Sequence, residues 1–243
     1  MTLRVDRRGR VAILTLDDPE RRNALTGPLV DDIVARCDEL EVDEGVGALV
    51  VTGTDPAFCA GADLGDLMAL RADGDPDALA ASLRGIYEGF LRIRRCPLPV
   101  VAAVNGPAVG AGFNLALAAD VRVVSPVARF DARFLEIGLH PGGGHAWLLE
   151  RAVGPQAAAA VVLFGERLDG EAAVRVGLAW ECVPLDALLD RAVELAEQAA
   201  SIPRPLAARA KQTLRDAAFQ PDFDAAVATE VDRQVWSVRS TRK

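Results

Sequence analysis

The architecture follows from the stretch Pro99-Val-Val-Ala-Ala-Val-Asn-Gly-Pro-Ala-Val-Gly-Ala-Gly112. Its first half is a short uncharged run of strand type, and its second half is a glycine-containing turn. The same order occurs earlier, where a strand-like run at 47–52 precedes Ala57-Phe-Cys-Ala-Gly-Ala-Asp63-Leu64. A third strand-like run follows at 121–125. Strands that alternate with turns and helices in this way predict an α/β fold with a buried sheet.

Both turns have a composition suited to binding a negatively charged oxygen. Small residues let the backbone approach another group closely, and a helix that begins at such a turn aims free N–H groups into one space. Two converging donors of this kind form an oxyanion hole. The alternative is that the glycines only permit tight turns or close helix packing. Spacing excludes a dinucleotide site, because Leu115 stands where the motif begun by Gly110 and Gly112 requires a third glycine.

The remaining segments predict a hairpin and a series of helices. Alternating apolar residues around Arg8-Gly9 indicate a β-hairpin over 3–16, and Thr26 or Gly27 is placed to cap a helix. A further helix is expected over 78–95. From Gly144 onward apolar residues fall at helical spacing, and within that part only 180–183 is typical of a strand.

The chain is expected to have two parts. Residues 1–184 form the core, and residues 185–243 form a helical region that packs on the core or on a neighbouring subunit. Amphipathic segments at 205–214 and 223–235 carry the apolar stripes that such packing needs.

Composition narrows the function classes. The chain has 243 residues, is 51% hydrophobic and carries a net charge of −8, which argues against a general nucleic-acid binder. The longest uncharged stretch, 97–119, is interrupted by prolines and glycines, so no membrane span is expected. The four cysteines form no C-x-x-C pair and the first residues lack an apolar signal segment, which predicts a reduced, cytoplasmic setting.

Six segments occur in a recognisable order: Pro19-Glu-Arg-Arg-Asn-Ala-Leu25, the two turns above, Ala128-Arg-Phe130, Gly138-Leu-His-Pro-Gly142 and 172–184. Over Leu3 to about Pro184 the chain resembles the enoyl-CoA hydratase/isomerase family, also called the crotonase family. The resemblance implies a crotonase-like ββα spiral with a helical C-terminal trimerisation region. It also implies an acyl-CoA thioester as ligand, no metal, no cofactor beyond the substrate's coenzyme A, and a homotrimer or dimer of trimers.

Carried over residue by residue, the resemblance places two oxyanion donors on the backbone N–H groups of Ala60 and Ala111. It assigns substrate contacts to Arg22, Ala24, Ala60, Gly61, Ala62, Asp63, Leu64, Gly110 and Phe134. Arg22 stands where the family meets the coenzyme's phosphates. Asp63 has a second interpretation, as the N-cap of a helix that begins near Leu64.

The sequence departs from the hydratase pattern at the two positions that transfer protons. The family's two glutamates correspond here to Asn114 and Phe134, and neither side chain transfers a proton. Syn addition of water to a double bond requires two carboxylates that share the water. Hydration by the standard route is therefore not expected, and Asn114 is assigned a positioning role through its amide.

Four side chains are candidate substitutes for the missing glutamates. One of them, Asp131, precedes Phe134 by three residues and has the same alternative as Glu136, a surface carboxylate. Glu136 lies two residues beyond Phe134, and the alternative for it is an ion-paired surface carboxylate. His140 and His145, the only histidines, flank a glycine-rich turn, and histidine commonly exchanges protons near neutral pH. Their alternatives are packing in the turn for His140 and capping of the next helix for His145.

The sequence thus predicts an enzyme that stabilises a thioester enolate, nominally an enoyl-CoA hydratase or isomerase of fatty-acid metabolism. A non-catalytic acyl-CoA binding protein is the first alternative, since Asn114 and Phe134 replace the proton-transfer groups. A structural assembly protein that uses its C-terminal helices is the second alternative.

Overall fold

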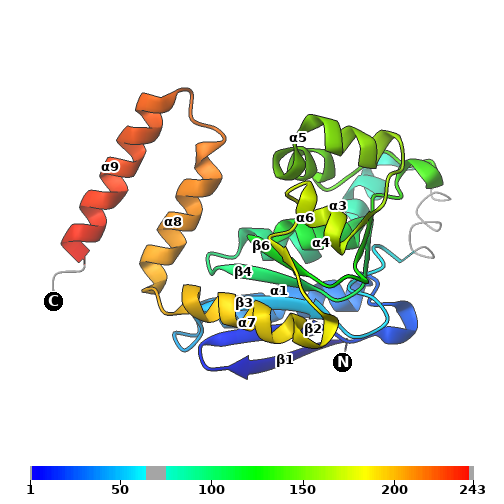
Figure 1. Ribbon diagram of the computed structural model, residues 1–243, viewed down its shortest axis with the longest axis horizontal. Helices are drawn as coiled ribbons and strands as arrows, with labels where there is room; N and C mark the ends of the chain where they lie inside the picture. The colour runs from blue at the N-terminus through cyan, green and yellow to red at the C-terminus, as the bar shows by residue number, and fades with distance from the viewer. Residues whose placement is uncertain (1, 64–74, 241–243) are drawn as a thin grey trace.

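The computed structural model describes residues 2–63 and 75–240, and its main feature is a six-stranded sheet of order β1-β2-β3-β4-β6-β9 (Figure 1). The strands are β1 (Leu3–Arg8), β2 (Val11–Leu16), β3 (Ala48–Gly53), β4 (Val100–Val104), β6 (Val121–Val124) and β9 (Glu181–Cys182). β1 and β2 pair antiparallel, which confirms the predicted hairpin, and the other neighbours pair parallel. Because β3 and β4 are parallel neighbours, the loops that follow them leave the same edge of the sheet.

A second, three-stranded sheet lies beside that edge. It consists of β5 (Pro107–Val109), β7 (Arg129–Asp131) and β8 (Leu168–Asp169), with β7 in the middle. The expectation that 180–183 is the only strand in the last third was wrong, because β8 is a strand as well. Strands of two or three residues are too short to show a period of two in the sequence.

Helices cover one face of the main sheet with a large apolar core. They are α1 (Gly27–Val42), α3 (Pro76–Arg95), α4 (Ala111–Ala118), α5 (His145–Leu163) and α6 (Gly170–Arg175), with short 3-10 turns η1 (Pro19–Arg21) and η2 (Leu135–Ile137). Thr26 caps α1 as predicted, through a bond from the N–H of Leu29. α3 begins two residues before the predicted start because Asp75 caps it and Pro76 opens it.

The opposite face of the sheet is covered by α7 (Leu185–Ala200). Alternate strand residues such as Val50 and Val101 form a second core with Leu188, Ala192 and other small residues of this helix. The strand residues are thus buried on both faces, which is why they occur in nearly continuous apolar runs. The first helix after residue 184 therefore packs on the core.

The last two helices project from this body as an antiparallel pair (Figure 1). They are α8 (Arg204–Ala217) and α9 (Phe223–Ser240), and both extend beyond the predicted amphipathic segments. α9 buries none of its residues in this chain. Within the described residues, no helix is both long enough and apolar enough to span a membrane.

Candidate active site

The two glycine-containing turns are held against each other by backbone contacts. Cys59 and Ala108 form a parallel bridge, and the N–H of Val109 donates to the carbonyl oxygen of Cys59 at 3.0 Å. The first turn of α4 packs directly on this carbonyl, since a Cβ on Gly112 would overlap the Cys59 oxygen. Only glycine at position 112 lets the two segments approach this closely.

Ala111 is the first residue of α4, as the sequence predicted for a helix starting at this turn. Gly110 precedes it with φ +53°, a left-handed conformation that favours glycine, and its own N–H donates to the carbonyl of Asp131 at 2.9 Å. The first N–H groups of a helix lack intrahelical acceptors. Among the described residues the N–H of Ala111 has no acceptor.

The donor expected on Ala60 is not available. The N–H of Ala60 donates to the carbonyl oxygen of Arg22 at 3.0 Å and so is already used. Gly61, with φ +97°, then changes the backbone direction, and the N–H of Ala62 has no acceptor among the described residues. A Cβ built on Gly61 would lie 3.4 Å from the nitrogen of Ala111, which shows how close the two segments are. The prediction for Ala60 is therefore corrected to Ala62.

A cavity of about 220 Å³ opens between these two segments. Its walls include seven of the residues predicted for the site, namely Ala60, Gly61, Ala62, Gly110, Ala111, Phe134 and His140. Tyr87, Arg133 and apolar side chains from α3 and from the segment 132–142 complete the wall. The N–H groups of Ala62 and Ala111 thus belong to residues that share one small, mainly apolar cavity.

Asn114 and His145 do not line this cavity but form a buried pair. Nδ2 of Asn114 donates to the carbonyl of Gly142 at 3.0 Å, and Oδ1 lies 2.8 Å from Nδ1 of His145. Both side chains are almost fully buried. The Asn114 amide therefore positions the turn before α5, and it does so from outside the cavity wall.

His145 is not placed to exchange protons with a ligand. Burial lowers the pKa of His145 to about 4, so its imidazole is neutral at physiological pH. Since Oδ1 of Asn114 accepts from Nδ1, Nε2 carries no proton, and it is buried without a hydrogen-bond partner in the described structure. The ring packs edge-on against Phe113 and Phe134, with centroids 5.1 Å apart in both cases.

Glu136 lies outside the cavity in an exposed ion-pair cluster. Its carboxylate is 3.1 Å from Arg167 and 3.3 Å from Arg133, and both arginines also pair with the buried Asp131. The surface ion pair that the sequence offered as the alternative is what the structure shows. Glu136 is therefore withdrawn as a candidate acid or base.

His140 is the predicted substitute that does reach the cavity. It is exposed, and its Nδ1 lies 2.8 Å from the carbonyl of Pro141. Because a carbonyl only accepts, Nδ1 carries the proton in this contact and Nε2 is left to exchange one.

The remaining predicted residues lie around the loops. Arg22 is exposed with φ 52°, Ala24 is buried, and neither is part of the cavity wall. Asp63 ends the first described segment, while Leu64 and the helix expected to follow it lie outside the described residues. Cys59 is a fully buried core residue, and this burial raises the pKa of its thiol to about 12.

Tyr87 is a cavity residue that the sequence analysis missed. Its hydroxyl lies beside the backbone of Gly143, and a phenol can both donate and accept a hydrogen bond. Partial burial raises the pKa of Tyr87, which keeps the phenol protonated at neutral pH. A Cβ on Gly142 would overlap this hydroxyl. The available signal was a lone tyrosine, the only one in the chain, on the apolar side of a predicted helix.

The cavity wall is short of acidic groups. Within the described residues no aspartate or glutamate lines it, and its polar side chains are those of Tyr87, Arg133 and His140. Two-carboxylate activation of a water molecule therefore has no counterpart in this wall.

Comparisons with known proteins agree with the architecture. The model of the family "Enoyl-CoA hydratase/isomerase" matches residues 6–238. "Probable enoyl-CoA hydratase EchA14" of Mycobacterium tuberculosis H37Rv is 49% identical over 88% of this chain and 81% of its own length. "1,2-epoxyphenylacetyl-CoA isomerase" of Escherichia coli K12 is 36% identical over 79% of this chain and 74% of its own.

A solved structure has the same fold. The enoyl-CoA hydratase from Polaromonas sp. JS666 superposes with a TM-score of 0.90 at 31% identity, covering 97% of this chain and 91% of that one. The predicted crotonase-like fold is therefore confirmed. From the family match over nearly the whole chain, the paired turns and these relatives, we conclude that the chain belongs to the enoyl-CoA hydratase/isomerase family.

Proposed function

We propose that this protein is an enzyme that binds an acyl-CoA thioester with its carbonyl oxygen between the N–H groups of Ala62 and Ala111. The observation that carries the proposal is that both donors lack acceptors in the described structure and both residues line one cavity. Loss of an α-proton from a thioester places negative charge on that oxygen as an enolate. Each donor aimed at the charge stabilises the transition state by about 2.7–4 kcal/mol.

The wall offers one route for the proton. His140 Nε2 accepts the α-proton and returns the same proton to the α- or γ-carbon of the enolate, while the Tyr87 hydroxyl, which lines the same cavity, stays protonated and donates a hydrogen bond. This arrangement supports isomerisation or α-proton exchange of an acyl-CoA better than hydration by paired carboxylates. The chemistry uses no cofactor other than the coenzyme A of the substrate.

Deuterium exchange at the α-carbon tests enolate formation directly. Butyryl-CoA incubated in D2O with the enzyme is expected to gain α-deuterium, measured by mass spectrometry. Position 111 offers a matched pair of variants, because proline is tolerated at the first residue of a helix but has no N–H. Ala111→Pro should lower exchange by about 10²–10³-fold, whereas Ala111→Gly, which keeps the N–H, should retain most of it. Equal exchange in the two variants would refute the role of this donor.

A non-catalytic acyl-CoA binding protein remains the second candidate, favoured by the lack of carboxylates in the described wall. It predicts tight butyryl-CoA binding by calorimetry with no α-deuterium and no turnover of crotonyl-CoA. His140→Gln separates the two functions, since only the enzyme loses exchange while it retains binding.

We also propose that the chain assembles with copies of itself, as a trimer or a dimer of trimers. α9 exposes an apolar stripe of Phe223, Val227, Val231, Val235 and Val238, which no described residue of the same chain covers. Exposed stripes of this size mark interaction surfaces. Light scattering on the purified protein should give a multiple of the monomer mass, and Val231→Asp should reduce it.

A further inference from the structure

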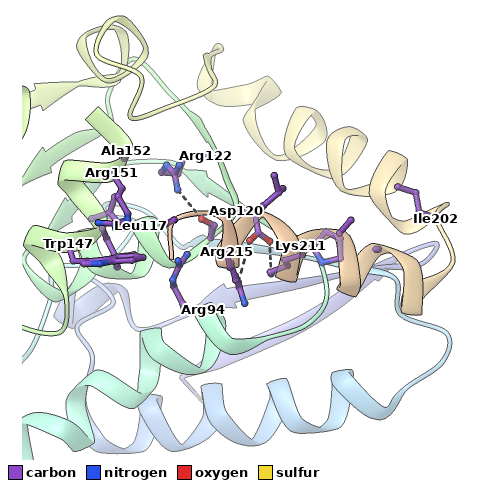
Figure 2. A pocket seen from close by; sticks show the side chains of 17 residues that line it. Arg94, Leu117, Asp120, Arg122, Trp147, Arg151, Ala152, Ile202, Lys211 and Arg215 are labelled. Carbon is purple, nitrogen blue, oxygen red and sulfur yellow. Dashed lines mark hydrogen bonds and ion pairs between the residues drawn. The ribbon is translucent and has the colours of Figure 1, made fainter. Parts of the chain in front are cut away.

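A second cavity, of about 450 Å³, lies at the opposite end of α4 from the candidate active site (Figure 2). α4 begins at Ala111, in the cavity of the candidate active site, and ends at Ala118, beside the second cavity. The two cavities are therefore roughly 12 Å apart along the helix axis. We call the second one the basic cavity. Its wall comes from the ends of α3 and α4, from α5, and from the inner side of α8.

The charge of the basic cavity is opposite to that of the whole chain. Five cationic side chains line it, and one carboxylate, Asp120, faces them; the cations are Arg94, Arg122, Arg151, Lys211 and Arg215. The chain as a whole has a net charge of −8. Side chains of one sign gathered around a cavity raise the local concentration of ions of the other sign.

Two of these cations are used by the fold itself. Arg122 donates to the carbonyls of Leu178 at 2.5 Å and Ala119 at 3.0 Å, which caps the end of α4. Lys211 is buried and donates to the carbonyl of Leu98 at 2.6 Å, and it pairs with Asp120 at 2.5 Å. These contacts commit most of the donors of both side chains to the fold.

The charges of the other three cations are balanced by fewer carboxylates and hydrogen bonds. Arg215 shares Asp120 with Lys211 at 3.4 Å, and its Nε is buried without a hydrogen-bond partner in the described structure. Arg94 has no carboxylate and no side-chain hydrogen bond among the described residues, and its guanidinium lies 5.7 Å from the centre of the Trp147 ring. Arg151 lies 3.9 Å from the same ring centre, and its ion pair with Glu150 is a long one, at 3.9 Å.

Arg94 and Arg215 carry like charges and line the same cavity, so they repel each other. Figure 2 shows the side chains of Arg94, from α3, and Arg215, from α8, extending toward the same space near Asp120. Burial and the nearby Arg215 both lower the pKa of Arg94, which means that its charge is poorly solvated and repelled. An anion placed between them would accept the unused N–H groups and remove the repulsion.

We propose that the basic cavity binds a phosphate group, held by Arg94, Arg215 and Arg151. Guanidinium groups match phosphate oxygens with paired N–H donors, and a dianion suits the excess of positive charge better than a single carboxylate does. The phosphate is either free or part of a small ester. Apolar walls for the organic substituent of an ester are provided by Leu117, Leu148 and Leu214. The volume is that of a small-molecule site.

Calorimetric titration of the full-length protein tests this site, with inorganic phosphate and phenyl phosphate as separate probes at constant ionic strength. Wild type should bind one phosphate group per chain and show a rise in Tm. Tighter binding of phenyl phosphate would assign the site to an ester, and equal binding would assign it to free phosphate. An equal Tm rise with chloride would overturn the proposal.

Variants separate a ligand site from a structural cluster. Arg94→Gln and Arg215→Gln should each weaken phosphate binding at least tenfold, while Arg36→Gln, an exposed arginine of α1, should leave it unchanged. Without phosphate, Arg94→Gln should keep or raise the Tm because it removes repulsion. The proposal fails if the phosphate response survives in Arg94→Gln and Arg215→Gln. It also fails if wild type binds no phosphate and these variants instead change the mass seen by light scattering, because the cavity would then receive an acidic segment of a second copy.

Discussion

Nδ1 of His145 lies 2.8 Å from Oδ1 of Asn114, in a buried layer that connects the start of α5 to α4, whose first residue, Ala111, lines the candidate active-site cavity. The same asparagine donates to the carbonyl of Gly142 at 3.0 Å. The pair therefore links two parts of the cavity wall, although neither residue lines the cavity itself. The protonation of His145 in this pair can be measured through the pH dependence of the free energy of unfolding.

Stability should depend on pH through His145. Burial lowers its pKa from 6.5 to about 4 in the folded protein, so between these values the unfolded chain binds more protons. The contribution of His145 to the free energy of unfolding should thus be constant well above pH 6.5 and fall by up to about 3 kcal/mol as the pH drops toward 4. Urea unfolding from pH 4 to 7.5 measures this, and His145→Asn should remove that part of the slope. His140→Asn is the control, and a slope unchanged in His145→Asn would contradict the assignment.

Glycine at position 112 should be required for both stability and binding. Ala at this position places a methyl group against the Cys59 carbonyl, a backbone atom that moves only with its whole segment. Gly112→Ala should cost about 1–3 kcal/mol or more and reduce butyryl-CoA binding, because it pushes the two donor segments apart. Gly85→Ala is the matched control: Gly85 is an exposed residue of α3 with open space around it. This variant should stabilise the protein by up to about 1 kcal/mol, and denaturant unfolding measures both.

Neighbouring glycines should respond differently to alanine. At Gly142 the added methyl meets the hydroxyl and the ring carbon Cζ of Tyr87, so the half-buried ring must turn about its Cα–Cβ bond; Gly142→Ala should therefore cost some stability and lower α-proton exchange. At Gly143, with φ +66°, the methyl meets the buried Phe90 ring, so Gly143→Ala should be clearly destabilising. Tyr87→Phe should reproduce the effect of Gly142→Ala on exchange. If Tyr87→Phe has full activity, the hydrogen bond from the hydroxyl has no role in exchange.

Asn23 should hold the first donor segment in place. Its Nδ2 donates to the carbonyls of Thr54 and Ala57 at 2.8 Å each, and its side chain is fully buried. Truncation in Asn23→Ala leaves both carbonyls without this donor, which should lower the unfolding free energy by about 2–4 kcal/mol. Thr213→Ala, which removes a partly exposed hydroxyl on α8 bonded to Arg209 and Arg233, should cost less. Similar losses in the two variants would argue against this role.

Much of the fold was predictable because it depends on local pattern. The hairpin, β3, β4, β6 and the helices are encoded by apolar runs, by helical spacing and by caps such as Thr26. The short strands β5 and β8 were not, since their pairing is decided by neighbours far along the chain. The same holds for the projection of α8 and α9 from the body.

The candidate site was likewise predictable only in part. The sequence by itself predicted that the two glycine-containing turns meet and that a helix starts at the second one, and its resemblance to the family predicts that Asn114 and Phe134 stand where the usual glutamates do. Only the tertiary structure decided that the N–H of Ala60 is used by Arg22, so that Ala62 is the available donor.

Tertiary packing also separated the remaining candidates. It buried His145, paired Glu136 with arginines, and brought Tyr87 of α3 against the turn at Gly142. The physical reason is common to these cases. Residue types and spacing fix which groups are available, but a hydrogen bond, a burial or a charge pair depends on atoms from segments that only folding brings together.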